Sequence, residues 1–198
     1  MGFAVARAAR DAGHSVTLIA GPVALKTPPG VRRVDVVSAR DMLAAVLAAV
    51  KGEERIGEEP GIEEHPSPFT VLVMTAAVAD WRPARRAARK LKKSEMDGTL
   101  RLVRNPDILK SVRGPHVRIG FAAETGLPDA EAARKCREKG LDLVVGNDVT
   151  RADSGFGTAT NRVSFITPDG RVQHLPLMSK LAVARRIVSF AERIASNG

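Results

Sequence analysis

The stretch FTVLVMT, residues 69–75, is an almost continuous run of apolar side chains without a regular alternation of polar and apolar residues. Such a run is typical of a β-strand that is covered on both faces, as strands in parallel sheets are. Segments with helical and strand patterns alternate through most of the chain around it. The sequence therefore predicts an α/β fold with a Rossmann-like, doubly wound and mostly parallel sheet.

Hydrophobic spacing, together with the positions of glycine and proline, predicts the remaining elements. Gly13 is expected to end the first helix, and Asp169 with Gly170 to form the turn of a C-terminal hairpin. We expect helices at 2–12, 39–52, 105–112, 129–140 and 178–195, a solvated acidic loop at 53–68, strands at 14–20, 31–37, 69–75, 99–104, 117–123 and 141–148, and the hairpin over 161–177. The 198 residues fit a single domain.

The beginning of the chain is unusual for this fold. Residue 2 already lies in what the pattern predicts to be the first helix of a Rossmann-like unit, with no strand or glycine-rich turn before it. In a complete unit that strand is central, and the turn supplies backbone amides that bind phosphate. Two explanations are open: another strand takes that place, or the first strand and glycine-rich loop are missing, which we favour.

The basic charge is concentrated in one segment. Seven of the lysines and arginines lie between Arg82 and Lys93, and without them the formal net charge of +9 falls to +2. Aromatic residues make up only 4% of the chain, and tyrosine is absent. Single-strand nucleic-acid binders usually stack bases on more aromatic side chains than this. We therefore expect no nucleic-acid partner.

The cellular compartment is predicted from cysteine content and apolar runs. A single cysteine, Cys136, cannot form an internal disulfide, which suits a reducing compartment. The longest apolar run, 71–79, is far shorter than the roughly 20 residues that span a bilayer. We expect a soluble cytoplasmic protein without membrane association.

Doubly wound sheets bind ligands beyond the carboxyl ends of their strands. Segments 76–81, 122–125 and 147–150 take these positions. In the first of them, Asp80 follows the small residues Ala76, Ala77 and Ala79, which let a flat group approach the backbone. Asp80 can accept hydrogen bonds from ligand hydroxyls or help to hold a metal. It can equally cap a turn, because aspartate is common in turns.

Two helical features also have a functional and a purely structural interpretation. NPDIL, residues 105–109, starts a helix whose free amides can bind an anion, with Asn105 as the expected N-cap and Pro106 at the first helical position. It is otherwise an ordinary helix start. Lys135 and Lys139 share one helix face, but Lys135 can simply pair with Glu131 in solvent.

The lysine-rich segment RKLKK, residues 89–93, has the same two interpretations. A loop that carries lysines can close over a polyphosphate and neutralise charge that develops during a displacement reaction. The alternative is a solvated run of charge. The four histidines lack metal-ligand spacing, and no zinc or serine-nucleophile motif is present.

Taken in order, six stretches resemble one known family. They are MGFAVARAARDAGHSVTLIAGPVALKTPPGVRRVDVVSARDM (1–42), AAVADWRP (76–83), KLKK (90–93), NPDIL (105–109), GFAAET (120–125) and NDV (147–149). The chain is similar over its whole length to the phosphopantothenate–cysteine ligase domain of bacterial coenzyme A biosynthesis. The resemblance implies that the carboxylate of 4′-phosphopantothenate attacks the α-phosphate of CTP, and that the amine of L-cysteine then displaces CMP. In many bacteria this domain is fused behind a flavin-dependent decarboxylase.

The resemblance also implies roles for particular residues. Lys90, in a basic flap over about 82–98, matches the lysine implicated in forming the acyl-cytidylate. The positions that match nucleotide-contacting residues are Met74, Thr75, Ala76, Asp80, Pro106, Asp107, Ile108, Leu109, Phe121, Lys135 and Lys139. The resemblance further implies Mg²⁺ bound with CTP, a homodimer, and FMN only where a decarboxylase domain lies upstream; the metal ligands are not specified.

One departure from the family concerns the start of the chain. Family members carry, just before the match to Met1, a strand and a loop with an asparagine tied to handling the acyl intermediate, and neither is present here. An inactive nucleotide-binding fragment of the same fold is therefore an alternative function. A nucleic-acid-binding module and an NAD(P) oxidoreductase fit less well, the latter because no G-x-G-x-x-G turn is present.

Overall fold

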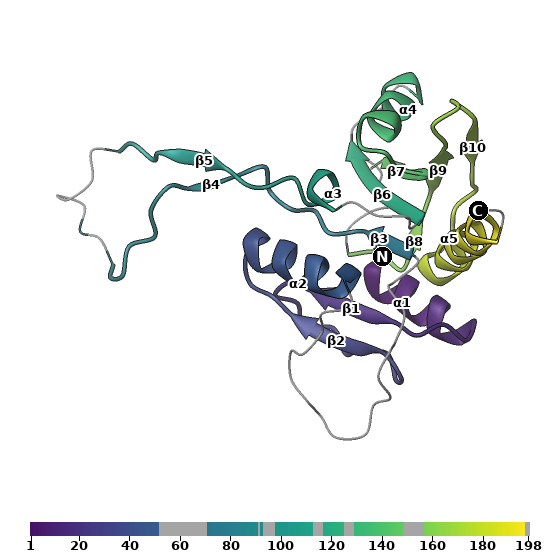
Figure 1. Cartoon of the computed structure of the whole chain (residues 1–198), viewed down its shortest axis with the longest axis horizontal. Helices are drawn as coiled ribbons and strands as arrows, with labels where there is room; N and C mark the ends of the chain where they lie inside the picture. The colour runs from purple at the N-terminus through teal and green to yellow at the C-terminus, as the bar shows by residue number, and fades with distance from the viewer. Residues whose placement is uncertain are drawn as a thin grey trace.

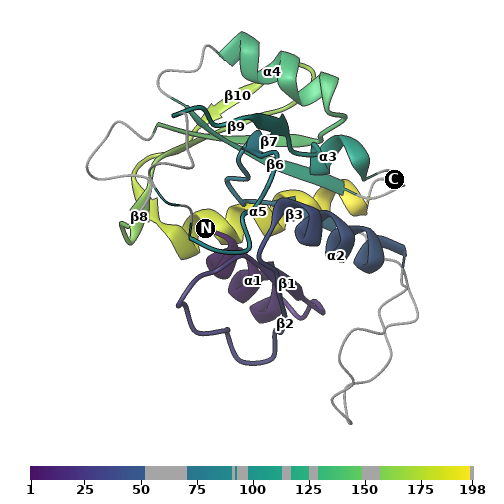
Figure 2. The same cartoon turned by 90° about the vertical axis from the view of Figure 1, so that its left-hand side faces the viewer.

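A computed structural model of the chain describes residues 1–51, 71–90, 92, 98–112, 117–124, 129–148 and 157–196. The loop expected at 53–68, residues 91 and 93–97 of the basic segment, and residues 149–156 fall outside these ranges. Figures 1 and 2 show a central sheet with helices packed around it, and Figure 1 shows a long two-stranded arm that projects from the body.

The central sheet has five strands in the order β10-β9-β7-β6-β3. These are β3 (Val71–Met74), β6 (Val117–Glu124), β7 (Leu143–Asp148), β9 (Val163–Ile166) and β10 (Val172–His174). Strands β3, β6 and β7 are parallel, whereas β9 is antiparallel to β7 and β10 is antiparallel to β9. The predicted α/β class with parallel central strands is confirmed, and so is the C-terminal hairpin, which turns at Gly170 with φ +88°.

Helices cover both faces of this sheet because successive strand residues point to opposite sides. Leu143 and Val145 of β7 are fully buried in a cluster with helix α5 (Lys180–Ala195). Val144, between them, packs instead with Cys136 of helix α4 (Asp129–Glu138). The apolar run of this strand therefore fits a strand that is covered on both faces.

A second, smaller sheet lies beside the first. Strand β1 (Thr17–Ala20) pairs in parallel with β2 (Arg32–Asp35), and the helices α1 (Gly2–Asp11) and α2 (Ala39–Lys51) pack against this pair (Figure 1). In the described part of the chain no ladder joins β1 to β3. Among the described strands, β3 is therefore an edge strand of the five-stranded sheet. Its four residues are half-buried, whereas its sequence predicts a strand that is covered completely on both faces.

Helix α1 ends as predicted at a glycine. Gly13 has φ +90°, and its N–H donates to the carbonyl oxygen of Arg10 at 3.0 Å, while His14 N–H donates to that of Ala9 at 3.1 Å. These two bonds satisfy carbonyl groups that the last helical turn leaves without partners. The left-handed backbone explains why glycine occupies the position.

The arm consists of β4 (Trp81–Pro83) and β5 (Leu102–Arg104), which pair antiparallel with Trp81 opposite Arg104. The arginine guanidinium lies 5.1 Å from the centroid of the tryptophan ring. The remaining short elements are α3 (Ile108–Ser111), β8 (Thr160–Asn161) and β11 (Met178–Ser179), and β11 leads into α5 with Ser179 as the N-cap. None of the helices in the described ranges has the length and apolar character needed to cross a membrane.

Candidate active site

Asn105 joins two segments that the sequence analysis singled out separately. Its backbone N–H donates to the carbonyl oxygen of Asp80 at 2.8 Å, and its side-chain amide donates to that of Ala79 at 2.7 Å. Nη1 of Arg82 donates to Oδ1 of Asn105 at 3.1 Å and also to the carbonyl oxygen of Arg104. The end of AAVAD and the start of NPDIL are thereby held side by side at the carboxyl edge of β3.

The start of helix α3 differs from the prediction. Asp107, not Asn105, is the N-cap, and its Oδ1 accepts a hydrogen bond from the backbone N–H of Lys110 at 3.2 Å. Asn105 cannot take this role because its amide binds Ala79 and Arg82. The predicted helix over 105–112 is accordingly shorter, Ile108–Ser111, and Pro106 precedes it.

Asp107 also forms an ion pair with Lys139, at 3.1 Å between Oδ2 and Nζ. Burial by itself raises the pKa of the Asp107 carboxyl, but the Lys110 N–H and the Lys139 ammonium offset burial, so the net pKa is lowered. The lowered pKa means that this ion pair stabilises the fold above the unfolded-state value of 3.8 and that its contribution is lost as the pH falls through the folded pKa. Lys139, at the end of α4, is thus brought to the start of α3.

Arg118 fixes the position of these two helix ends relative to each other. Its guanidinium donates to the carbonyl oxygen of Gly140 at 3.1 Å and to that of Leu109, while its backbone N–H donates to Asp142 Oδ2 at 2.8 Å. Sequence reasoning missed this residue. The signal available was an arginine within the otherwise apolar stretch VRIGFAA (117–123), where a charge requires a partner.

A glycine two positions further along β6 allows α3 to approach the sheet. A Cβ on Gly120 would lie 2.7 Å from Cδ1 of Leu141 and 3.4 Å from Cδ1 of Leu109. The absence of a side chain therefore leaves room for Leu109, one of the predicted nucleotide-contacting residues, to pack over β6. Ile108, beside it, is buried against α2.

The structure separates some of the other predicted residues from this cluster. Phe121 is half-buried and packs with the core on the α5 side of the sheet, the face opposite Leu109. Lys135 lies 3.8 Å from Glu131, which is the structural pairing considered above. Met74, Thr75 and Ala76 lie at the end of β3 and line a cavity between β3 and β1.

Lys90 is exposed on the segment that follows β4. Figure 1 shows the described part of this segment continuing along the arm, away from the body of the molecule. The backbone carbonyl oxygen of Lys90 accepts a hydrogen bond from Nη1 of Arg89 at 3.5 Å. The described residues thus do not bring Lys90 to Asp107 or Lys139. Its predicted catalytic role stays a prediction.

Cys136 and the acidic residues give no sign of other chemistry. The buried thiol of Cys136 lies 3.1 Å from the carbonyl oxygen of Leu141, and burial raises its pKa to about 11. A thiol with this pKa stays protonated near neutral pH and is a poor nucleophile. In the described ranges, no three His, Cys, Asp or Glu side chains form a group that could hold a metal ion.

The model of one protein family matches almost the whole chain. It is the DNA/pantothenate metabolism flavoprotein C-terminal domain, and it matches residues 1–56 and 60–194. The chain belongs to this family. The family membership predicted from the six ordered stretches is confirmed.

Relatives within this family include proteins named coenzyme A biosynthesis bifunctional protein CoaBC. The one from Vibrio vulnificus (strain YJ016) is 38% identical over 194 residues, 95% of this chain and 44% of the relative. The one from Escherichia coli (strain K12) is 40% identical over 188 residues, 91% of this chain and 42% of the relative. The chain thus spans less than half the length of these curated relatives.

Solved structures of the same family have the same fold. The crystal structure of the C-terminal domain of a CoaBC protein is 33% identical, with a TM-score of 0.76 over 100% of this chain and 83% of that one. A DNA/pantothenate metabolism flavoprotein from Streptococcus pneumoniae, 19% identical with a TM-score of 0.71, shares the fold over 99% of this chain and 87% of its own. The Rossmann-like family fold predicted from the sequence is confirmed.

The ion pair between Asp107 and Lys139 can be tested by titration. We predict that Lys139→Met raises the pKa of the Asp107 carboxyl, because it removes a hydrogen bond and a positive charge that lower it. Carbon-detected NMR of the side-chain carboxyl against pH measures the change directly. Lys135→Met is the matched control, since Lys135 faces Glu131 and should leave the Asp107 titration unchanged. Equal titration curves for the parent and Lys139→Met would contradict the pairing.

Proposed function

We propose that the chain ligates 4′-phosphopantothenate with L-cysteine in coenzyme A biosynthesis, using CTP to activate the carboxylate. Membership of the family and the 33% identity to a CoaBC C-terminal domain support this activity. The structural observation that carries the proposal is the contact made by Asn105, which places AAVAD beside NPDIL at the carboxyl edge of the parallel strands. Ligands of doubly wound sheets bind at that edge.

The reaction proceeds in two balanced steps. A carboxylate oxygen of 4′-phosphopantothenate attacks the α-phosphorus of CTP, and the bond to the bridging oxygen breaks, so that pyrophosphate leaves with that electron pair. The amine nitrogen of cysteine then attacks the acyl carbon of the acyl-cytidylate. CMP leaves as the amide forms, and the amine loses one proton to a base or to water. Both steps develop negative charge on phosphate oxygens, which nearby cations stabilise.

The residues around Asn105 suit the two ends of a nucleotide. Asp80 and the small side chains of Ala76 and Ala77 are exposed. A base and a ribose can therefore approach the backbone, and the ribose hydroxyls can donate hydrogen bonds to the Asp80 carboxylate. Lys139 uses one of its three ammonium N–H groups on Asp107, which leaves others to bind phosphate oxygens. Met74, Thr75, Pro106, Ile108 and Leu109 complete the proposed set of contacts near Asn105, whereas the predicted contacts of Phe121 and Lys135 stay predictions because both residues lie apart from this cluster.

In this proposal Lys90 and its neighbours act as a flap. The segment from Arg82 to Lys93 carries seven basic residues, and the described ones in 84–90 and 92 are exposed. A triphosphate bound at the carboxyl edge of β3 attracts such a segment over itself. Closure places the Lys90 ammonium against the phosphate oxygens on which charge develops during the first step.

The remaining components of the proposal follow from the chemistry and the relatives. CTP enters as its Mg²⁺ complex, and the oxygen atoms of Asp80 are ligands of the kind that Mg²⁺ prefers. In this proposal FMN belongs to the separate decarboxylase part of the bifunctional relatives. This chain and that decarboxylase catalyse consecutive reactions. We place the reaction in the cytoplasm.

Nucleotide selectivity tests the proposed function. We predict that CTP, in the presence of Mg²⁺, binds at least roughly tenfold more tightly than ATP, GTP or UTP, because a site that hydrogen-bonds one base leaves its polar groups unpaired with another. Isothermal titration calorimetry with the four nucleotides measures the difference. Asp80→Asn is expected to weaken CTP binding. Equal affinity for all four nucleotides would rule out a cytosine-recognising site and with it this proposal.

The role of Lys90 is tested separately. We predict that Lys90→Gln slows pyrophosphate release by about 10²–10³-fold while CTP still binds, since one charge-stabilising donor is lost from the transition state. Lys92→Gln, two residues along the same run, is the matched control and should release pyrophosphate at nearly the parent rate. If both variants slow pyrophosphate release slightly and to the same extent, RKLKK is a solvated run of charge and the proposal of a flap is wrong.

We further propose that the chain forms a homodimer through the arm. Trp81 and Leu102 are 49% and 48% exposed, and the pairing of β4 with β5 places them on the same face of the arm. Leu100, two residues before Leu102, is 63% exposed. Large apolar side chains gathered on a projecting ribbon are typical of a protein interface. A dimer through the arm brings the flap of one subunit close to its partner.

Self-association tests this interface. We predict that Leu102→Glu weakens the dimer by roughly tenfold or more, because a carboxylate buried without a partner costs more than the 1.4 kcal/mol that a tenfold change requires. Sedimentation equilibrium measures the association constant. Val37→Glu is the control, because Val37 is 79% exposed and lies outside the arm. The interface is wrong if both variants associate like the parent chain.

A further inference from the structure

The basic residues between Arg82 and Lys93 do not all have the same surroundings. The described residues in 84–90 and 92 are exposed, whereas Arg82 is half-buried. Nη1 of Arg82 donates to Oδ1 of Asn105 at 3.1 Å and also to the carbonyl oxygen of Arg104. Both acceptors lie at the end of β5, on the opposite side of the arm. Arg82 is therefore bound to the protein itself, and its place in the basic run does not make it part of the flap.

These contacts lie at the base of the arm, where β4 and β5 leave the body of the molecule (Figure 1). Trp81 pairs with Arg104 in the ladder, and the guanidinium lies 5.1 Å from the centroid of the ring. Further along the arm, the Ala84 N–H donates to the carbonyl oxygen of Arg101 at 2.9 Å. A two-stranded ribbon is only marginally stable in water. Contacts at its base must therefore determine the direction in which the arm extends.

Asn105 connects Arg82 to the segment that follows β3. Its side-chain amide donates to the carbonyl oxygen of Ala79 at 2.7 Å, and its backbone N–H donates to that of Asp80 at 2.8 Å. The oxygen of the same side chain accepts from Arg82. The acceptor and the donors of an amide lie in one planar group. A movement of the backbone at Ala79 and Asp80 therefore also moves the acceptor of Arg82.

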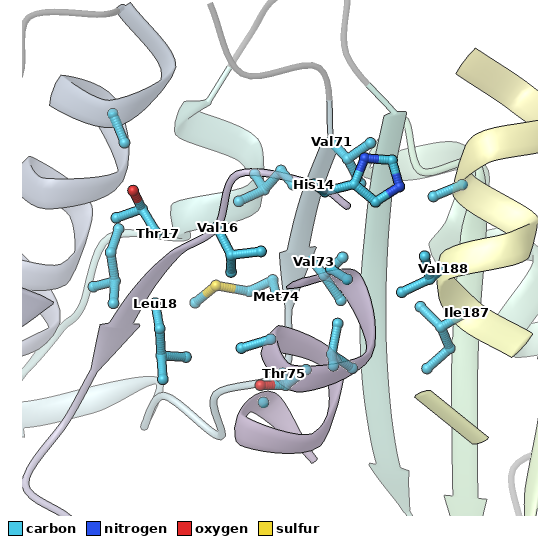
Figure 3. Close-up of a pocket in the computed structure, with 18 of the residues that line it drawn as sticks. His14, Val16, Thr17, Leu18, Val71, Val73, Met74, Thr75, Ile187 and Val188 are labelled. Carbon is cyan, nitrogen blue, oxygen red and sulfur yellow. The ribbon is translucent and has the colours of Figure 1, made fainter. Parts of the chain in front are cut away.

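The segment from Thr75 to Asp80 is held at its other end as well. Figure 3 shows Thr75 at the end of β3, next to helix α1. A Cβ on Gly2 would lie 2.7 Å from Oγ1 of Thr75, so the helix and this end of the segment are in close contact. Because both ends are fixed, the position of Asp80 relative to the body of the molecule also fixes Asn105 and, through it, Arg82.

We propose that Arg82 is a positioning residue for Lys90. Its guanidinium braces the base of the arm against Asn105, and this brace sets the direction in which the flap extends from the nucleotide site. The inference rests on the proposed function, because Lys90 acts on the nucleotide only in that reaction. Arg82 itself does not touch the nucleotide. Misplacement of a reacting group by about 1 Å can cost ~10²-fold in rate, so loss of the brace slows the first step.

Pyrophosphate release by single variants tests this role. Arg82→Met is expected to slow release by roughly 10- to 100-fold and to keep the affinity for CTP within about twofold of the parent value. Arg101→Met is the matched control, because it removes the same charge from an exposed position on the opposite side of the arm. It should release pyrophosphate at nearly the parent rate. If Arg82→Met loses as much CTP affinity as rate, Arg82 binds the nucleotide directly and the proposal is overturned.

A double-mutant cycle with Lys90→Gln separates positioning from an independent contribution. If Arg82 acts through Lys90, adding Arg82→Met to Lys90→Gln slows release by less than about threefold, since the lysine that it positions is already gone. If the two substitutions are additive, Arg82 acts by another route and the proposal is overturned. Arg82→Gln, which is uncharged but still polar, takes the place of Arg82→Met if that variant does not fold, and the same two outcomes apply.

Trp81 reports on the base of the arm without any substrate, because it is the only tryptophan of the chain. In time-resolved fluorescence anisotropy, Arg82→Met should increase the nanosecond local motion of Trp81, and Arg101→Met should not. Unchanged motion in Arg82→Met removes the brace and leaves the proposed function intact. If instead the parent chain releases no pyrophosphate with all substrates present, the proposed function is wrong, and the role of Arg82 through Lys90 is overturned with it.

Discussion

The parallel pairing of β6 with β7 is the interaction on which the other parts of the molecule depend. A strand in the middle of a sheet needs hydrogen-bond partners on both edges and apolar cover on both faces. Ile119, Leu143 and Val145 are completely buried on the α5 side, and Val144 is buried on the α4 side. These contacts fix the positions of the strands, and helix α3, helix α4 and the segment after β3 are arranged around them.

Polar contacts then hold these segments in place. The side chain of Asn105 holds Ala79 and Arg82, and the guanidinium of Arg118 holds the carbonyl groups of Leu109 and Gly140. Neither residue belongs to the set that the family resemblance assigns to the nucleotide. Both act by fixing backbone segments, and in the proposed function the carboxylate of Asp80 and part of the Lys139 ammonium are then left to face a ligand. The geometry of the site therefore depends on side chains that need not touch the substrate themselves.

The sequence predicts the elements of this fold better than it predicts their edges. The alternation of apolar segments with Gly13 and Gly140 is local, so helices α1 and α4 and the strands around them follow from it. The N-cap of α3 does not, because Asn105 and Asp107 are equally suitable in isolation, and only the distant partners of Asn105 decide between them. Strand β4 was not predictable for the same reason: Pro83 disfavours a strand, and the pairing with β5 is a contact between segments about 20 residues apart.

The cavity between β1 and β3 and the candidate site are connected through one short segment. Met74, Thr75 and Ala76 line the cavity, and the chain reaches Asp80 only four residues later. On the far side of this segment Asn105 holds the carbonyl groups of Ala79 and Asp80. The segment is thus anchored at its far end by hydrogen bonds, while at its near end β3 is paired on one edge alone among the described strands.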